Sequence, residues 1–109
     1  MNKIIISILI SFMSTGVLAS DNIRAKVMYV GTWGHGGIFI NLDKVMNEPG
    51  CSKKEIWIPG TSPSIKEILG LAMTAYAADQ FIHVKTKGCV NGYPTINPTN
   101  ESFFHLGPR

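Results

Sequence analysis

Apolar and polar residues alternate with a period of two in the first half of the chain. This alternation predicts a strand at residues 24–30, a second at 38–42 and a short third at 55–58. Four glycines among residues 31–37 predict a loop, so the first two strands should form a hairpin. The residues expected to face the core are Ala25, Val27, Tyr29, Ile38, Ile40, Leu42, Ile56 and Ile58.

The strongest helical pattern lies at residues 61–80, where apolar residues recur at helical spacing. Two starts are open: Ser62 followed by Pro63, or a capping box of Ser64 and Glu67. Alanines make this helix apolar on more than one face, which favours association between copies. The predicted apolar stripe is Ile65, Ile68, Leu69, Ala72 and Tyr76.

Strand signals return after the helix. Residues 81–86 alternate, with Ile82, Val84 and Thr86 on one face, and Asn91-Gly92 is a turn signal. A fifth strand is expected within 93–106, interrupted near Pro98.

The resulting order is three strands, a helix and two strands, which predicts a mainly β fold with one helix. It is the order of a small five-stranded barrel of the oligonucleotide/oligosaccharide-binding (OB) type. A helix laid across an open antiparallel sheet would give the same order.

Residues 1–19 have the pattern of a secretory signal peptide. A lysine precedes the apolar run 4–13, and Val17 and Ala19 are at the −3 and −1 positions expected of small residues. The alternative, a membrane anchor, is disfavoured because the apolar run is too short to span a bilayer. The sequence therefore predicts a periplasmic or secreted protein, not inserted in a membrane, whose single domain is residues 20–109.

The two cysteines, Cys51 and Cys89, are expected to form a disulfide in an exported protein. Closing a loop of this length is worth roughly 4 kcal/mol in the chain-entropy account. A reactive thiol or a metal pair is the alternative, but neither cysteine has a second cysteine or a histidine at ligand spacing.

Charge gives few hints about partners. Without residues 1–19 the chain has nine Lys and Arg against seven Asp and Glu, so its formal net charge is 9 − 7 = +2. The charges are scattered along the sequence without interleaved aromatic residues, so no nucleic-acid partner is expected. The three histidines are far apart in sequence, and no metal or cofactor is expected.

The most plausible catalytic side chain is His35, which would make the protein a small hydrolase. It has no serine in a nucleophile elbow and no free cysteine to activate, and the carboxylates form no recognisable acid–base pair. The glycines around it lack the ending of a phosphate-binding loop. An enzyme is therefore not expected.

Recognition through aromatic side chains remains. Trp33 lies in the predicted glycine loop, and Trp57 alternates away from Ile56 and Ile58. Flat amphipathic rings suit sugars and protein partners alike. We therefore expect Trp33, His35 and Trp57 to contact a ligand; the alternative is that Trp57 packs in a second layer of core.

The chain resembles the B subunits of AB5 toxins, nearest those of subtilase cytotoxin and the pertussis-like typhoid toxin. The resemblance covers about residues 25–97 and rests on the cysteine pair, the Ala-rich helix at 65–78 and the strand at 81–85. It implies an OB-type barrel, a ring of five copies with the helices lining the central pore, and glycan binding. The chain is shorter than the subtilase-type subunit, and none of that family's sugar-contacting residues can be placed on it.

Two functional hypotheses follow. The first is an exported, non-enzymatic domain that binds a glycan and forms a homo-oligomer, as a toxin B subunit does. The alternative is a monomeric periplasmic accessory or inhibitor protein that binds a protein or an envelope component.

Overall fold

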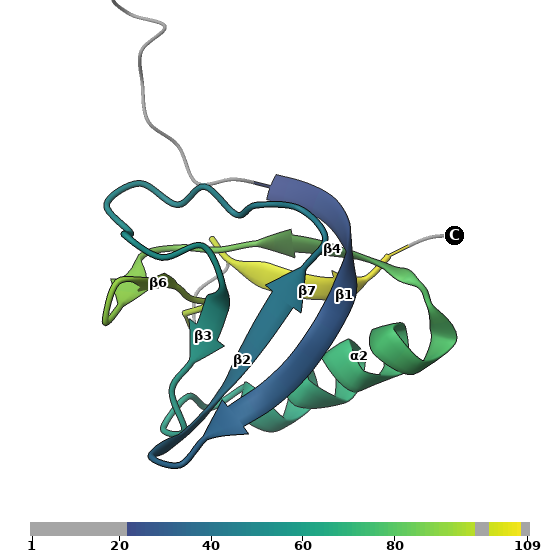
Figure 1. The fold of residues 1–109 in the computed structure, drawn as a ribbon, viewed down its shortest axis with the longest axis horizontal. Coiled ribbons are helices and arrows are strands. Elements are labelled where there is room, and N and C mark those ends of the chain that lie inside the picture. The colour runs from purple at the N-terminus through teal and green to yellow at the C-terminus, as the bar shows by residue number, and fades with distance from the viewer. Residues whose placement is uncertain (1–21, 98–100, 108–109) are drawn as a thin grey trace, which may run out of the picture.

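One long bent strand organises the fold. The computed structural model describes residues 22–97 and 101–107, so the predicted signal peptide and Pro98 lie outside the described residues. Figure 1 shows the strands curling around the long first strand, with the single helix at one end. The elements are β1 (Asn22–Trp33), β2 (Gly36–Leu42), β3 (Ile56–Ile58), α2 (Ile65–Ala78), β4 (Phe81–Lys85), β5 (Cys89–Val90), β6 (Tyr93–Pro94) and β7 (Phe103–Leu106).

The main sheet has five antiparallel strands in the order β3-β2-β1-β4-β7. The first half of β1 pairs with β4, from Asn22↔Lys85 to Lys26↔Phe81, and its second half pairs with β2. Within the described residues β3 and β7 remain the two edges, so the sheet is curled but not closed. The predicted mainly β fold with one helix is confirmed.

A bulge in β1 changes the predicted facing of its residues. The register with β2 shifts between Val27 and Tyr29, which leaves Met28 as an extra residue. Ala25 and Val27 are buried as predicted, but Tyr29 is 46% exposed and Val30 turns toward the core instead. The prediction that Tyr29 faces the core was therefore wrong, because the alternation does not continue through the bulge.

The glycine-rich loop is shorter than predicted. β1 continues to Trp33 and β2 begins at Gly36, so only Gly34 and His35 form the turn of the hairpin. Gly31 lies within β1 opposite Phe39, and a Cβ at Gly31 would come within 2.6 Å of the Phe39 ring. The hairpin is confirmed, with Trp33 held at the end of a strand.

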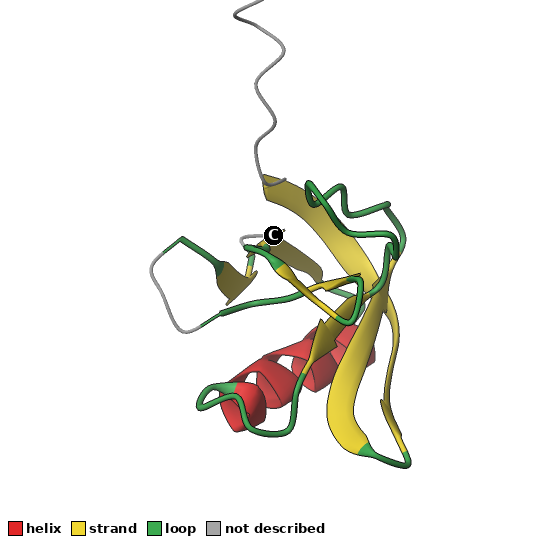
Figure 2. Ribbon diagram, turned by 90° about the vertical axis from the view of Figure 1, so that its left-hand side faces the viewer, coloured by secondary structure: helices red, strands yellow, loops and turns green. Residues whose placement is uncertain are grey.

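Helix α2 contacts β1, β2, β4 and β7 (Figure 2). Its fully buried side chains are Ile68, Ala72 and Ala75, whereas Tyr76 of the predicted stripe is 57% exposed. Ser64 occupies the N-cap position, but the structure places no side-chain hydrogen bond at this cap, so the predicted capping box is not formed.

The core is aliphatic. Fully burying one Ile or Val side chain is worth about 1.5–3 kcal/mol, so these residues dominate the stability of so small a domain. The predicted inward faces of β2 and β4 are confirmed. The core comprises Ala25, Val27, Ile38, Ile40, Leu42, Met46, Ile56, Ile58, Ile68, Ala72, Ala75, Ile82, Val84, Ile96 and Phe104.

The predicted disulfide is confirmed. Cys51 and Cys89 are bonded with their Cα atoms 5.6 Å apart, which ties the segment before β3 to the start of β5. Beside it the buried carboxylate of Glu48 accepts hydrogen bonds from the Thr86 hydroxyl and the Gly88 N–H. A disulfide is compatible with a location outside the cytoplasm.

The predicted Asn91-Gly92 turn is also confirmed. Both residues have positive φ, at 52° and 84°, as a tight two-residue hairpin requires, and they join β5 to β6. Among the described residues, no helix is both long and apolar enough to cross a membrane.

Candidate functional site

The structure brings together the three side chains that the sequence predicted as ligand contacts. The Trp33 ring centroid lies 5.3 Å from that of His35 and 5.7 Å from that of Trp57, and His35 lies 5.7 Å from Trp57. All three rings are nearly parallel, with interplanar angles of 17° to 27°. Together with Tyr93 we call these residues the aromatic cluster.

The hairpin positions the first two members of the cluster. Trp33 ends β1 and His35 lies in the turn, while the Thr32 hydroxyl donates a hydrogen bond to the Gly37 carbonyl and so braces the two strands against each other. Pairing of β2 with β3 sets Phe39 opposite Trp57. Trp33, His35 and Trp57 are therefore brought together by the β1–β2 hairpin and β3, and Tyr93 is added by β6.

A glycine allows the hairpin to approach the indole closely. Gly37 has a φ of +78°, and a Cβ there would lie 2.8 Å from Trp57 Nε1 and 2.7 Å from the Ile58 carbonyl oxygen. A side chain at this position would therefore push the indole away from the hairpin backbone. Gly37 thus serves the packing of the hairpin on Trp57, whereas Gly34 and Gly36 have open space around the position of a Cβ.

The members of the cluster differ in exposure. Trp57 is only 5% exposed, whereas Trp33 is half-buried and His35 is exposed. Trp57 therefore offers little surface to a ligand and serves as the base on which Trp33 and His35 stack. Its burial agrees better with the alternative that Trp57 packs in a second layer of core. Its buried Nε1–H has no hydrogen-bond partner within the described part of the chain, and such an unpaired group costs about 1–3 kcal/mol.

The sequence reasoning missed Tyr93. Its ring centroid lies 5.1 Å from Trp33 and 6.3 Å from Trp57, and the Lys53 ammonium lies 5.9 Å from its ring. Tyr93 directly follows the Asn91-Gly92 turn, and the Gly92 carbonyl accepts a hydrogen bond from the Lys53 N–H. An aromatic residue after a tight turn was visible in the sequence, but its direction depends on how the small hairpin packs.

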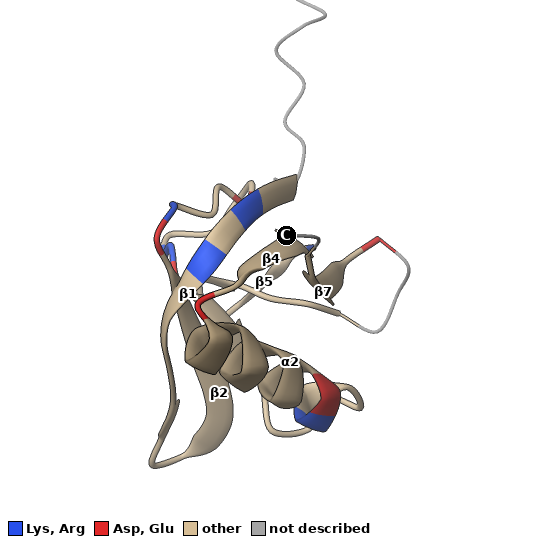
Figure 3. Cartoon of the chain, turned by 90° about the vertical axis from the view of Figure 1, so that its right-hand side faces the viewer, with Lys and Arg blue, Asp and Glu red and all other residues tan. Residues whose placement is uncertain are grey.

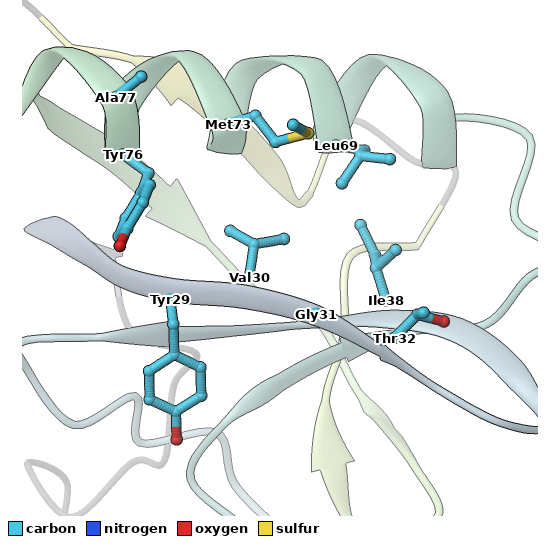
Figure 4. A pocket seen from close by; sticks show the side chains of 9 residues that line it. All are labelled: Tyr29, Val30, Gly31, Thr32, Ile38, Leu69, Met73, Tyr76 and Ala77. Atoms are coloured by element: carbon cyan, nitrogen blue, oxygen red, sulfur yellow. The ribbon is translucent and has the colours of Figure 1, made fainter.

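A second surface lies between β1 and α2. A groove of about 470 Å³ is lined by Val30, Ile38 and Leu69 among others. Figure 4 shows Val30 and Ile38 pointing from the strands toward the helix, with Leu69 pointing from the helix toward Ile38. Met73 is 56% and Tyr76 is 57% exposed along the helical side of this groove. β1 pairs with β4 only as far as Lys26. The later part of β1, which lines the groove, therefore pairs with β2 alone.

Possible metal ligands do not cluster in the described part of the chain. Within residues 22–97 and 101–107 no three His, Cys, Asp or Glu side chains lie close enough to hold a metal ion. His35 stacks on indoles, while His83 and His105 lie opposite each other on β4 and β7. The arrangement at His35 is therefore one for ring stacking.

Comparisons with family models, with curated proteins and with solved structures find no match. The resemblance to toxin B subunits accordingly rests on the sequence pattern alone.

Proposed function

We propose that the protein is an exported, non-enzymatic binding domain whose ligand is a glycan held on the aromatic cluster. One observation carries the proposal: Trp33 and His35 stack nearly parallel over the buried indole of Trp57 at the end of the β1–β2 hairpin. The apolar face of a sugar ring can lie on such rings, while its hydroxyl groups remain hydrated or bind nearby polar atoms.

The rings are held in place before any ligand arrives. Stacking on Trp57 and the edge-on contact with Tyr93 restrict the Trp33 side chain. Because ordering a flexible side chain on binding costs about 0.5–1.5 kcal/mol, a fixed ring retains more of its contact energy as affinity. This pre-organisation favours a binding role for Trp33.

The wider proposal keeps the expectations from the sequence. Residues 1–19 are removed on export, the curled sheet functions as an OB-type barrel, and several copies associate as a ring of the B-subunit type. The exposed Met73 and Tyr76 on α2 support such association, because large apolar side chains exposed side by side often mark a contact surface.

A glycan array probed with oxidised protein of residues 20–109, followed by titration calorimetry on any hit, tests the proposal. Trp33→Ala should weaken binding by about 2 kcal/mol or more, as expected for a central aromatic contact. Met28→Ala is the control, since it removes an exposed large apolar side chain of β1 outside the aromatic cluster and should leave glycan affinity unchanged. An array without signal, or equal affinity of the Trp33 variant, would refute glycan binding at this cluster.

The alternative is a monomeric periplasmic accessory or inhibitor protein that binds a protein partner. The groove between β1 and α2 favours it, because apolar side chains line a hollow beside a strand that is paired on one side. Light scattering on a sizing column separates the two proposals. A ring of about five copies supports the first, and a monomer without glycan binding supports the alternative.

A further inference from the structure

The outer face of β1, β4 and β7 carries cationic and aromatic side chains that are far apart in sequence. We call this surface the basic face. Strand register puts Arg24 opposite His83 and His83 opposite His105, so these three residues form one row across three strands. The remaining residues of the basic face are Lys26, Phe81, Lys85 and Phe103.

Both phenyl rings of the basic face are already in contact with charged or imidazole groups. The Arg24 guanidinium lies 3.8 Å from the centroid of the Phe81 ring, and Lys26 Nζ lies 5.1 Å from it. The Phe103 ring stacks on His105 at 4.4 Å and meets His83 edge-on at 5.3 Å. The rings therefore hold the cationic side chains in position over the sheet.

Acidic groups lie at the border of this face. Asp79 pairs with Lys26 at 3.3 Å, and Glu67 of α2 lines the same surface hollow as His105. Figure 3 shows the basic positions on the first part of β1 and the acidic position where α2 ends. Between these borders, Arg24 and Lys85 give the face positive charge, and the two histidines lie beside them in the sheet.

We propose that the basic face binds an acidic polysaccharide, one that carries sulfate or carboxylate groups. Arg24 and Lys85 supply positive charge, and the imidazole rings of His83 and His105 lie beside them in the row and can donate hydrogen bonds to anionic oxygens. Neighbouring strands are about 4.8 Å apart, so the row of three spans roughly 10 Å, enough to contact successive anionic groups of an extended chain.

The ring contacts favour a polysaccharide over single-stranded nucleic acid. Nucleic-acid bases bind such a sheet by stacking on open aromatic faces. Here Arg24 occupies a face of Phe81 and His105 a face of Phe103. An anionic group on a saturated sugar ring can bind through the cationic side chains alone, without an open aromatic face. The contact with Phe81 holds the Arg24 guanidinium in place for such binding. The basic face is distinct from the aromatic cluster, and either proposal can fail without the other.

The test uses oxidised protein of residues 20–109 and heparin as the probe. Neutral dextran and a deoxythymidine oligonucleotide are the comparison ligands. The double variant Arg24→Gln/Lys85→Gln removes two cations from the face, and Lys54→Gln/Lys66→Gln removes two cations from elsewhere. His83→Leu/His105→Leu removes the two imidazole rings of the row.

We expect heparin to bind and neutral dextran not to bind. The affinity of the Arg24/Lys85 variant should fall about tenfold, and that of the Lys54/Lys66 control should be almost unchanged. The histidine variant should also bind heparin more weakly, because it lacks the hydrogen-bond donors of the row. Raising NaCl from about 50 mM to about 200 mM should weaken binding. Melting temperatures verify folding, and if the Arg24/Lys85 variant does not fold, the histidine variant decides.

Several outcomes would overturn the proposal. Equal weakening in both lysine-containing double variants would mean that only net charge matters. Unchanged heparin affinity of the histidine variant would remove the role assigned to the two imidazole rings. An oligonucleotide that binds as tightly as heparin would contradict the ligand class, and binding of dextran would contradict recognition through charge.

Discussion

Substituting Gly37 by alanine should disrupt the aromatic cluster through two separable effects. The first is backbone strain, because Gly37 has a φ of +78° and a left-handed conformation costs a residue with a Cβ about 1–2 kcal/mol. The second is steric, because the new Cβ would lie 2.7 Å from the Ile58 carbonyl oxygen and 2.8 Å from Trp57 Nε1. Overpacking of this kind typically costs a further ~1–3 kcal/mol. The expected loss of unfolding free energy is therefore about 2–5 kcal/mol.

Two neighbouring glycines are matched controls for these effects. Gly36 has a φ of +100° but open space around the position of a Cβ, so Gly36→Ala should show the strain alone. Gly34 has open space and no positive φ, so Gly34→Ala should be almost neutral. Urea unfolding followed by far-UV circular dichroism gives the three free energies. Near-UV circular dichroism reports whether the indole of Trp57 has moved.

The difference between the variants at Gly37 and Gly36 isolates the clash with Trp57. The proposed clash is refuted if Gly37→Ala is no less stable than Gly36→Ala, because the indole and the hairpin backbone would then not be in contact. It is also refuted if Gly37→Ala leaves the near-UV spectrum unchanged. If the cluster binds glycans, Gly37→Ala should weaken that binding as well, because Trp57 supports Trp33.

Three other perturbations test the stability of the fold by urea unfolding. Glu48→Ala would leave the buried Thr86 hydroxyl and the Gly88 N–H without their acceptor, and should lower the unfolding free energy by about 1–3 kcal/mol. The control Glu55→Ala should lower it little, and equal effects of the two variants would contradict the role of the buried carboxylate. Reducing the Cys51–Cys89 bond with dithiothreitol should lower the unfolding free energy by about 2–5 kcal/mol, and an unchanged midpoint would show that the bridge adds no stability. Ala72→Leu should cost about 1–3 kcal/mol because Ala72 is completely buried against the sheet, and a neutral result would imply a loosely packed helix.

The features predicted well from sequence are those set by neighbouring residues. The alternation in β2 and β4, the helical spacing in α2 and the turn at Asn91-Gly92 all depend on contacts within one element or one hairpin. The predicted disulfide belongs with them, since it needed only an even cysteine count and the expected compartment. In each case the local pattern and the tertiary structure require the same residues.

The features missed depend on how strands pair. Tyr29 turns outward because β1 changes partner from β4 to β2 and accommodates the change with a bulge at Met28. Trp57 is buried although it alternates away from the core, because the β1–β2 hairpin covers the second face of β3. The alternation of residues within a single strand shows neither which strands pair with it nor which elements cover its second face.

The same dependence on register explains the basic face. From the sequence, the charges were interpreted as scattered and without interleaved aromatic residues. Pairing of β4 with both β1 and β7 nevertheless places Arg24, His83 and His105 in one row. Strand pairing can therefore create charge complementarity that no segment of the sequence contains.

The aromatic cluster and the basic face lie toward opposite ends of β1, and each end is braced separately. Arg24 lies where β1 pairs with β4, whereas Trp33 lies where β1 pairs with β2, and nine positions of strand separate them, at most about 30 Å. Sites this far apart without shared partners usually contribute additively. A ligand that contacts both would have to be a long chain, and a short oligosaccharide would contact only one. Ligand length would therefore decide whether the two surfaces act as two sites or as one extended site, because only a long acidic chain could gain affinity from both at once.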